Sequence, residues 1–298
     1  MAWLAYQWRD IAAAEDAFGE ALAKALELWP VQGVPTRPDA WLLSVAQREL
    51  LQAARRHRLH ASPEVQALLQ SDALHEDAPA VPDARLKLLF VCAHPAIDAS
   101  IRPALMLQTV LGLDAQVIAQ AMLTSPAAMA QRLVRAKQKI RDAGLRFEEP
   151  GADELPERLH AVLEAIYAAY GLGWDAVDSS VTNSTEVAGL RSEALFLVDL
   201  TSHLMPGEPE VMGLLALMHF CEARLPARYS QTGEFIPLAA QNTQLWNRPQ
   251  IGIAEQLLRK AAQLQRPGAF QLEAAIQDRK STRLNSSHRN TSRMPSSA

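Results

Sequence analysis

The sequence has little of several features on which common protein classes depend. It contains two cysteines, Cys92 and Cys221, far apart in 298 residues, so no disulfide framework is expected and both thiols should be buried as small apolar groups. No apolar run approaches the roughly 18 residues that a membrane-spanning helix needs. The first residues, MAWLAYQWRD, show neither the charged region nor the cleavage site of a signal peptide. These absences predict a reduced, cytoplasmic protein that does not contact a membrane.

The motifs of the common enzyme classes are missing as well. There is no glycine-rich phosphate or dinucleotide motif and no Gly-x-Ser-x-Gly nucleophile elbow. Cys92 and His94 lie on one turn, but two ligands are too few for zinc, which takes four. We therefore expect no catalytic residue, no metal and no cofactor, and the chain does not read as an enzyme.

What is present favours helices. Aromatic residues make up only 6% of the chain and hydrophobic residues 49%; alanine and leucine, both strong helix formers, dominate, and runs of β-branched residues are rare. The predicted fold class is all-α. Between the first two helices, Pro30 to Pro38 should form a loop and Asp39 should cap the next helix. Apolar periodicity and capping residues place the main helices at 11–28, 40–57, 102–112, 114–123, 125–141, 155–170, 186–204, 208–222, 250–264 and 267–277.

Shifts in composition divide the chain into segments. Helical segments are expected at 1–60, 84–146 and 155–278, joined by acidic linkers at 61–83 and 147–154. The paired helices of the third segment suit a helical-repeat-like extension. Residues 279–298, RKSTRLNSSHRNTSRMPSSA, are polar and basic; they should be disordered. Because they resemble translated sequencing-adapter sequence, we expect them to be non-native.

Charge is distributed unevenly along the chain. The net charge is −4, yet residues 37–60 sum to +3 and residues 100–147 to +5, whereas residues 148–278 sum to −10. Basic islands in an acidic chain are typical of polyanion binding. From composition alone, a solvated helix face explains them better.

The stretch 125–144, SPAAMAQRLVRAKQKIRDAG, is the most informative. At 100° per residue, one side of the helix carries the apolar residues Met129, Leu133, Ala136 and Ile140. The other side carries Gln131, Arg132, Arg135 and Lys139. Ser125 and Pro126 form a capped helix start, and Gly144 is a natural stop.

A second helix, 114–123, precedes this one after a short turn, with Asp114 as its cap. Two short helices of which the second is basic on its outer face match the helix-turn-helix arrangement. The second helix would lie in the major groove, where early side chains read base edges and later cations hold phosphates. The pattern thus predicts DNA binding, with a solvated surface helix as the alternative.

These residues resemble a bacterial RNA polymerase sigma factor of the extracytoplasmic-function type, in the subgroup with a tetratricopeptide-like C-terminal extension. Residues 10–30 and 37–58 are similar to sigma region 2, which would make segment 1–60 a region 2 that lacks its first part. Residues 84–144 are similar to region 4, the helix-turn-helix domain. Residues 155–171 and 208–228 are similar to the extension of that subgroup.

The resemblance implies the roles of particular residues. The acidic residues Glu15, Asp16 and Glu20 would dock on the β′ subunit of core RNA polymerase, which with β makes up the expected protein partner. Arg55, Arg56 and Arg58 would contact promoter DNA during its opening. Region 4 would read the upstream promoter element through Ser125, Ala128, Gln131, Arg132, Arg135 and Lys139.

The function so implied is promoter recognition and transcription initiation, with the polymerase supplying the chemistry. The acidic extension would modulate the two basic domains or bind a protein regulator. Two other interpretations stay open: a helical-repeat interaction module with a degraded sigma part, and a helix-turn-helix DNA-binding regulator that works without polymerase.

Overall fold

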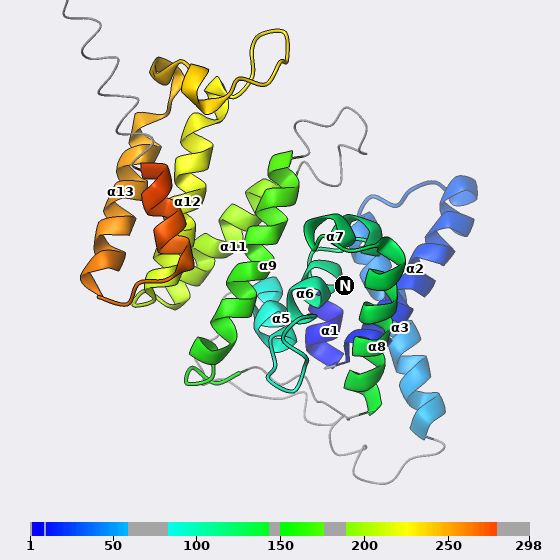
Figure 1. Ribbon diagram of the computed structural model, residues 1–298. Coiled ribbons are helices and arrows are strands. Elements are labelled where there is room, and N and C mark those ends of the chain that lie inside the picture. Colours follow the sequence, from blue (N-terminus) through cyan, green and yellow to red (C-terminus); the bar gives the residue numbers. More distant parts are fainter. Residues whose placement is uncertain (1, 9, 59–82, 143–149, 176–188, 279–298) are drawn as a thin grey trace, which may run out of the picture. The chain divides into compact units, whose positions relative to one another are not determined.

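The computed structural model describes residues 2–8, 10–58, 83–142, 150–175 and 189–278 (Figure 1). Over these residues the chain is built of α-helices and three short 3₁₀ turns, without a β-strand beyond one isolated bridge between Tyr229 and Phe235. The all-α prediction is confirmed. The chain divides into two compact units, Met1–Ala165 and Ile166–Ala298, and the boundary falls within helix α9 (Leu155–Asp175). The predicted linker 61–83 and tail 279–298 lie outside the described residues, apart from Asp83.

Unit 1 contains eight of the labelled helices, including the first half of α9. Besides α9 they are α1 (Ala2–Trp8), α2 (Ile11–Gln32), α3 (Pro38–Arg58), α5 (Ala84–Cys92), α6 (Arg102–Thr109), α7 (Ala115–Ala121) and α8 (Pro126–Asp142).

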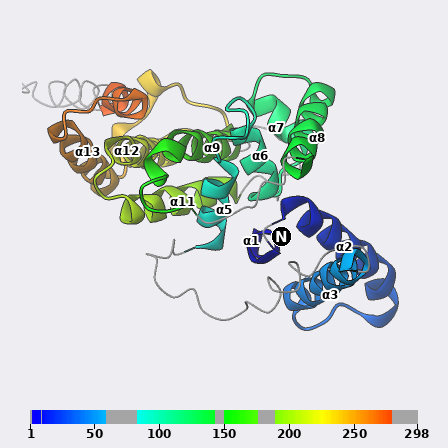
Figure 2. The same cartoon turned by 90° about the horizontal axis from the view of Figure 1, so that it is seen from below.

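Helices α2 and α3 form an antiparallel pair (Figure 2). The buried face of α2 consists of small residues, which allow close packing: Ile11, Ala14, Ala17, Ala21 and Ala25. At the far end of the pair, the rings of Trp29 and Trp41 meet edge to face with centroids 5.5 Å apart. Lys24 of α2 also forms an ion pair with Glu49 of α3.

Two details of this pair differ from the sequence prediction. Helix α2 continues through Pro30 to Gln32, with Gly33 (φ 85°) as its C-cap, because a proline in the last turn removes a single intrahelical hydrogen bond. Helix α3 begins at Pro38, so Asp39 lies in the first turn and does not cap it. Proline suits the first helical position, and an acidic residue beside it is favoured by the helix dipole.

The core of unit 1 lies around α5 and α6, which are apolar on nearly all sides. Leu86, Leu88 and Phe90 of α5 and Leu105 and Met106 of α6 have no exposed surface. The start of α9 belongs to this core. Its Arg158 is 3% exposed and donates to the carbonyl of Phe90 at 3.3 Å and to Glu154 at 2.9 Å.

Unit 2 holds the second half of α9, α11 (Leu190–Leu204), α12 (Pro209–Arg224), α13 (Arg248–Gln263) and a last helix at 269–278. Helix α12 is buried along most of its length, and α13 and the last helix lie beside it (Figure 1). Gly213 makes this closeness possible: a Cβ there would lie 2.7 Å from the backbone nitrogen of Gln271. Glu210 of α12 accepts hydrogen bonds from the backbone of Phe270 and Gln271, and so caps the last helix.

Most predicted helices of the extension are found, with shifted ends. Helix α9 continues to Asp175 and α13 begins at Arg248, while α11 is described from Leu190. The expected loop 225–249 contains the 3₁₀ turns η1 (Leu225–Ala227), η2 (Leu238–Ala240) and η3 (Thr243–Leu245). Among the described helices, none combines the length and the apolar character that crossing a membrane requires.

Candidate functional site

Helices α7 and α8 form a helix–turn–helix pair with a cap at the start of each helix. Asp114 accepts a hydrogen bond from the backbone of Val117 at 2.8 Å, and Ser125 accepts one from Ala128 at 3.3 Å. Between the helices the chain turns at Leu123, whose φ of 49° is in the left-handed region. Its side chain is 96% exposed. The turn therefore depends on the backbone conformation of Leu123 rather than on packing of its side chain. In Figure 2, α6, α7 and α8 form one cluster.

The two faces of α8 differ as predicted. The inner face packs into unit 1 through Met129, Leu133 and Ile140, which are 0%, 2% and 7% exposed. On the outer face, the predicted DNA contacts Ser125, Gln131, Arg135 and Lys139 are exposed, and Ala128 and Arg132 are half-buried. The structure thus brings all six predicted residues of this helix onto one accessible side.

Arg132 differs from the other cations on this face because it is held by a loop. Its guanidinium donates to the backbone oxygen and the hydroxyl of Ser100, at 3.0 and 3.1 Å. Ser100 lies in the segment between α5 and α6, which precedes α8 by about thirty residues in the sequence. Arg135 and Lys139 make no hydrogen bond or ion pair with any residue that the structure describes.

Lys137 is a residue that sequence analysis missed. Its ammonium donates to both carboxylate oxygens of Glu15, at 2.8 and 2.6 Å, and both side chains are less than a quarter exposed. The pair lies beside the buried thiol of Cys92. Burial raises the pKa of this thiol, and the charge of Glu15 raises it further, whereas the charge of Lys137 lowers it. Helices α2, α5 and α8 therefore meet at this ion pair.

Because of this contact, the three predicted polymerase-binding residues differ in exposure. Glu15 is half-buried in the ion pair with Lys137, whereas Asp16 and Glu20 are exposed on the same helix. No sequence signal could have found the pair, because its members are 122 residues apart.

The predicted promoter-opening residues fall at the end of α3. That helix includes Arg55, Arg56 and Arg58 in its backbone, but the side chains of all three lie outside the described residues.

A cavity of about 430 Å³ lies against α8, between its second half and the α5–α6 segment. The carboxylate of Asp98 lies at its edge. The pKa of Asp98 is lowered chiefly by hydrogen bonds from the hydroxyl and backbone of Ser100, and further by the nearby charges of Lys139 and Arg132.

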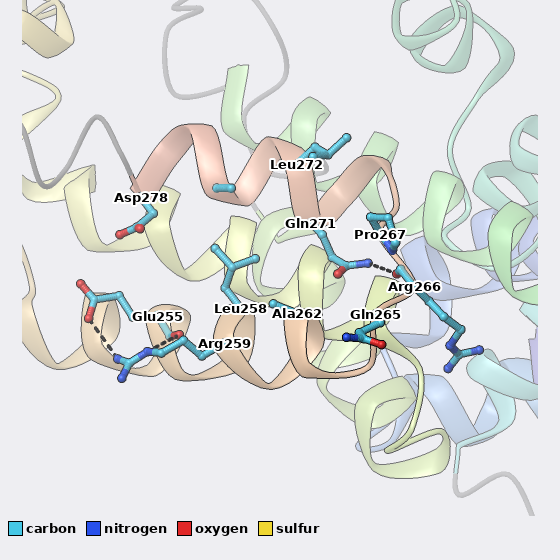
Figure 3. Close-up of a pocket in the computed structure, with 11 residues that line it drawn as sticks. Glu255, Leu258, Arg259, Ala262, Gln265, Arg266, Pro267, Gln271, Leu272 and Asp278 are labelled. Atoms are coloured by element: carbon cyan, nitrogen blue, oxygen red, sulfur yellow. Dashed lines mark hydrogen bonds and ion pairs between the residues drawn. The ribbon is translucent and has the colours of Figure 1, made fainter.

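A larger hollow, of about 610 Å³, lies in unit 2 between α13 and the last helix. Figure 3 shows Leu258 and Ala262 of α13 facing this hollow, with Leu272 on the opposite helix. Its rim has charges of both signs, which include the Glu255–Arg259 ion pair and Asp278.

Unit 2 also contains a cluster of aromatic and polar side chains. Tyr170 stacks on Trp174, and its hydroxyl donates to Glu222 at 2.9 Å. Arg191 pairs with the same carboxylate at 3.0 Å. The guanidinium of Arg228 lies 4.2 Å from the ring centroid of Trp174. These contacts link α9, α11 and α12 within unit 2.

The described residues thus define an all-α protein with a helix–turn–helix pair whose outer face is basic. Residues 158–262 match the model of a protein family of unknown function, DUF6596. An uncharacterized protein of Rhizobium meliloti (strain 1021) is 40% identical over 276 residues, which cover 90% of this chain. The chain spans 64% of the length of that relative. No solved structure gives a significant match.

Proposed function

We propose that this protein is a sigma factor that gives core RNA polymerase the ability to recognise a class of promoters. The observation that carries the proposal is the two-sided character of α8. Its apolar side is buried in unit 1, and its outer side presents Gln131, Arg135 and Lys139 to the solvent. A capped helix of this kind, preceded by a second short helix, fits the major groove.

The polymerase part of the proposal rests on the first helices. The resemblance of residues 10–58 to sigma region 2 assigns polymerase docking to the acidic side of α2. Asp16 and Glu20 of that side are exposed, and their charge would suit a basic surface on the β′ subunit. Promoter opening would fall to the end of α3.

The test of this proposal is a comparison of DNA binding with and without core polymerase. A fluorescein-labelled duplex from upstream of the protein's own gene is titrated with the protein, with core polymerase, and with both, and anisotropy is measured. If the protein is a sigma factor, we expect tight, sequence-dependent DNA binding only when the protein and core polymerase are both present. Tight binding by the protein alone would point to a polymerase-independent regulator. No binding by the protein in any mixture, and no co-purification with polymerase, would point to an interaction module.

We also propose that the acidic extension modulates these activities. Residues 148–278 carry a net charge of −10, against +5 for residues 100–147, and opposite charges attract within roughly a Debye length of ~10 Å at 0.1 M salt. A truncation should retain α9 to Asp175, because its start packs into the core of unit 1 through Arg158. The proposal predicts a higher DNA affinity of a folded 1–175 variant, most clearly at low salt. An unchanged affinity would contradict it.

A further inference from the structure

The cavity against α8 has an apolar floor that comes from two separate parts of unit 1. Ile97 and Ile101 of the α5–α6 segment are 4% and 5% exposed, and Ile140 of α8 is 7% exposed. Ala136 completes the α8 side. Because alanine is small, it leaves room in the cavity for a ligand. A volume of about 430 Å³ is in the range of small-molecule sites.

The wall that faces α8 is fixed by its own hydrogen bonds, so the cavity is formed without a ligand. Asp98 accepts from the backbone and the hydroxyl of Ser100, at 2.9 and 2.7 Å. Arg102 donates to the carbonyls of Ile97 and Pro95, at 2.8 and 2.9 Å. The two bonds from Arg132 to Ser100 then tie this segment to α8. Ordering side chains and loops on binding costs free energy, and a site that is already ordered avoids this cost.

The rim of the cavity is cationic. Arg132, Arg135 and Lys139 carry three positive charges against the single negative charge of Asp98. The Asp98 carboxylate is already bonded to Ser100, whereas Arg135 and Lys139 make no hydrogen bond or ion pair with the residues that the structure describes. An apolar floor below two cations that form no ion pair with a described residue suits a molecule with an apolar body and one acidic group.

We propose that this cavity binds a small amphiphilic organic anion, such as an aromatic carboxylate or sulfonate. Its rings would cover Ile97, Ile101 and Ile140, and its acidic group would pair with Lys139 and Arg135. The same two cations are among the predicted DNA contacts of α8. The ligand and DNA therefore compete, and this second statement rests on the proposed function.

The test uses the full chain and 8-anilinonaphthalene-1-sulfonate, a fluorescent probe with an apolar body and one sulfonate. Fluorescence is titrated for the wild type and for Ala136→Phe, which fills the cavity. The matched control is Ala262→Phe, which places the same side chain in the other hollow (Figure 3). We expect saturable binding that Ala136→Phe weakens at least tenfold and Ala262→Phe leaves unchanged. Equal effects of the two substitutions, or no effect of either, would overturn the proposal.

A charge variant keeps the test decisive if Ala136→Phe disturbs folding. Lys139→Gln should weaken probe binding several-fold, while Lys260→Gln on α13, which is exposed outside both hollows, should not. If Lys139→Gln and Lys260→Gln weaken probe binding equally, the proposed binding site is contradicted. Because no DNA or polymerase is present, this result is independent of the proposed function.

Competition is then measured by adding duplex DNA together with core polymerase to the probe complex, with polymerase and probe alone as the blank. Displacement of the probe by DNA at low salt, and its absence in Lys139→Gln, would support the shared cations. Undiminished probe fluorescence at saturating DNA would show that the ligand and DNA do not compete. It would not contradict the proposed binding site.

Discussion

At the scale of single residues, the three predicted DNA-contacting cations of α8 divide into one that is held and two that make no hydrogen bond or ion pair with a described residue. Arg132 is bonded to Ser100, whereas Arg135 and Lys139 extend from the outer face without such a bond. Its bonds to Ser100 fix the Arg132 side chain in one direction, as base readout requires, and a free lysine suits a phosphate.

This difference predicts different effects of two substitutions on DNA binding. Arg132→Ala should reduce discrimination at one or two base pairs by about 1–3 kcal/mol. Lys139→Ala should weaken binding to all sequences alike and lower the slope of log K against log salt by about 1. Anisotropy titrations of the polymerase–protein complex at several salt concentrations measure both, with Lys260→Ala as the control. Equal, salt-independent effects would contradict the assignment.

The two thiols give a second prediction at this scale. Burial raises the pKa of both Cys92 and Cys221, and the thiolate is the reactive form. Both should therefore react slowly with Ellman's reagent at pH 8 in the native protein and quickly in guanidinium chloride. Fast reaction of Cys92 in the native protein would show that the contact of α2, α5 and α8 opens readily.

At the scale of elements, the turn between α7 and α8 contains a leucine in the left-handed backbone conformation, which leucine disfavours. Leu123 has a φ of 49° and is 96% exposed. A left-handed conformation costs an L-residue about 1 kcal/mol or more, which glycine avoids. Leu123→Gly should therefore raise the free energy of unfolding by roughly 0.5–1 kcal/mol, part of the gain being offset by the greater freedom of glycine in the unfolded chain.

The control for this prediction is Leu123→Val, which should destabilise because a β-branched residue tolerates positive φ least well. Urea denaturation of both variants, followed by circular dichroism, gives the two changes. A destabilised Leu123→Gly would mean that the exposed side chain or the turn conformation was assigned wrongly.

Local signals were sufficient to predict most elements. Asp114 and Ser125 cap the helices that the sequence assigned to them, because a cap depends on residues three positions apart. The turn at Leu123 was not predicted, since nothing in a leucine signals a left-handed φ. Helix α2 passes Pro30 because packing, here of Trp29 on Trp41, can outweigh a local breaker.

The same limit applies to the candidate site. Periodicity alone identified the outer face of α8, from Gln131 to Lys139. The loop that binds Arg132 and the acid that binds Lys137 could not be foreseen, because both are contacts between segments far apart in the chain. The charge pattern of the sequence predicts whether a surface is basic or acidic. It does not predict which residues its charged side chains contact.

At the scale of the whole molecule, the pair Glu15–Lys137 joins the α2 helix to the helix–turn–helix pair. Both side chains are less than a quarter exposed, so removing one leaves the other charge partly buried. Lys137→Met or Glu15→Gln alone should lower the free energy of unfolding by about 1–2 kcal/mol. The exchanged variant, with Glu15→Lys and Lys137→Glu together, should recover a large part of that loss.

Chemical denaturation of the wild type, Glu15→Lys alone, Lys137→Glu alone and the exchanged variant forms the cycle that isolates this interaction. Lys24, which pairs with Glu49 within the α2–α3 pair, supplies the control substitution Lys24→Met. Additive losses in the exchanged variant would show that Glu15 and Lys137 do not interact in solution.

The central claim, that this protein directs RNA polymerase to promoters, is tested most directly by run-off transcription. Core polymerase is incubated with and without the protein on a template from upstream of the protein's own gene, with residues 279–298 removed. The account predicts a discrete transcript that requires the protein and that Lys139→Ala weakens. The absence of any protein-dependent transcript, with no binding to core polymerase, would contradict it.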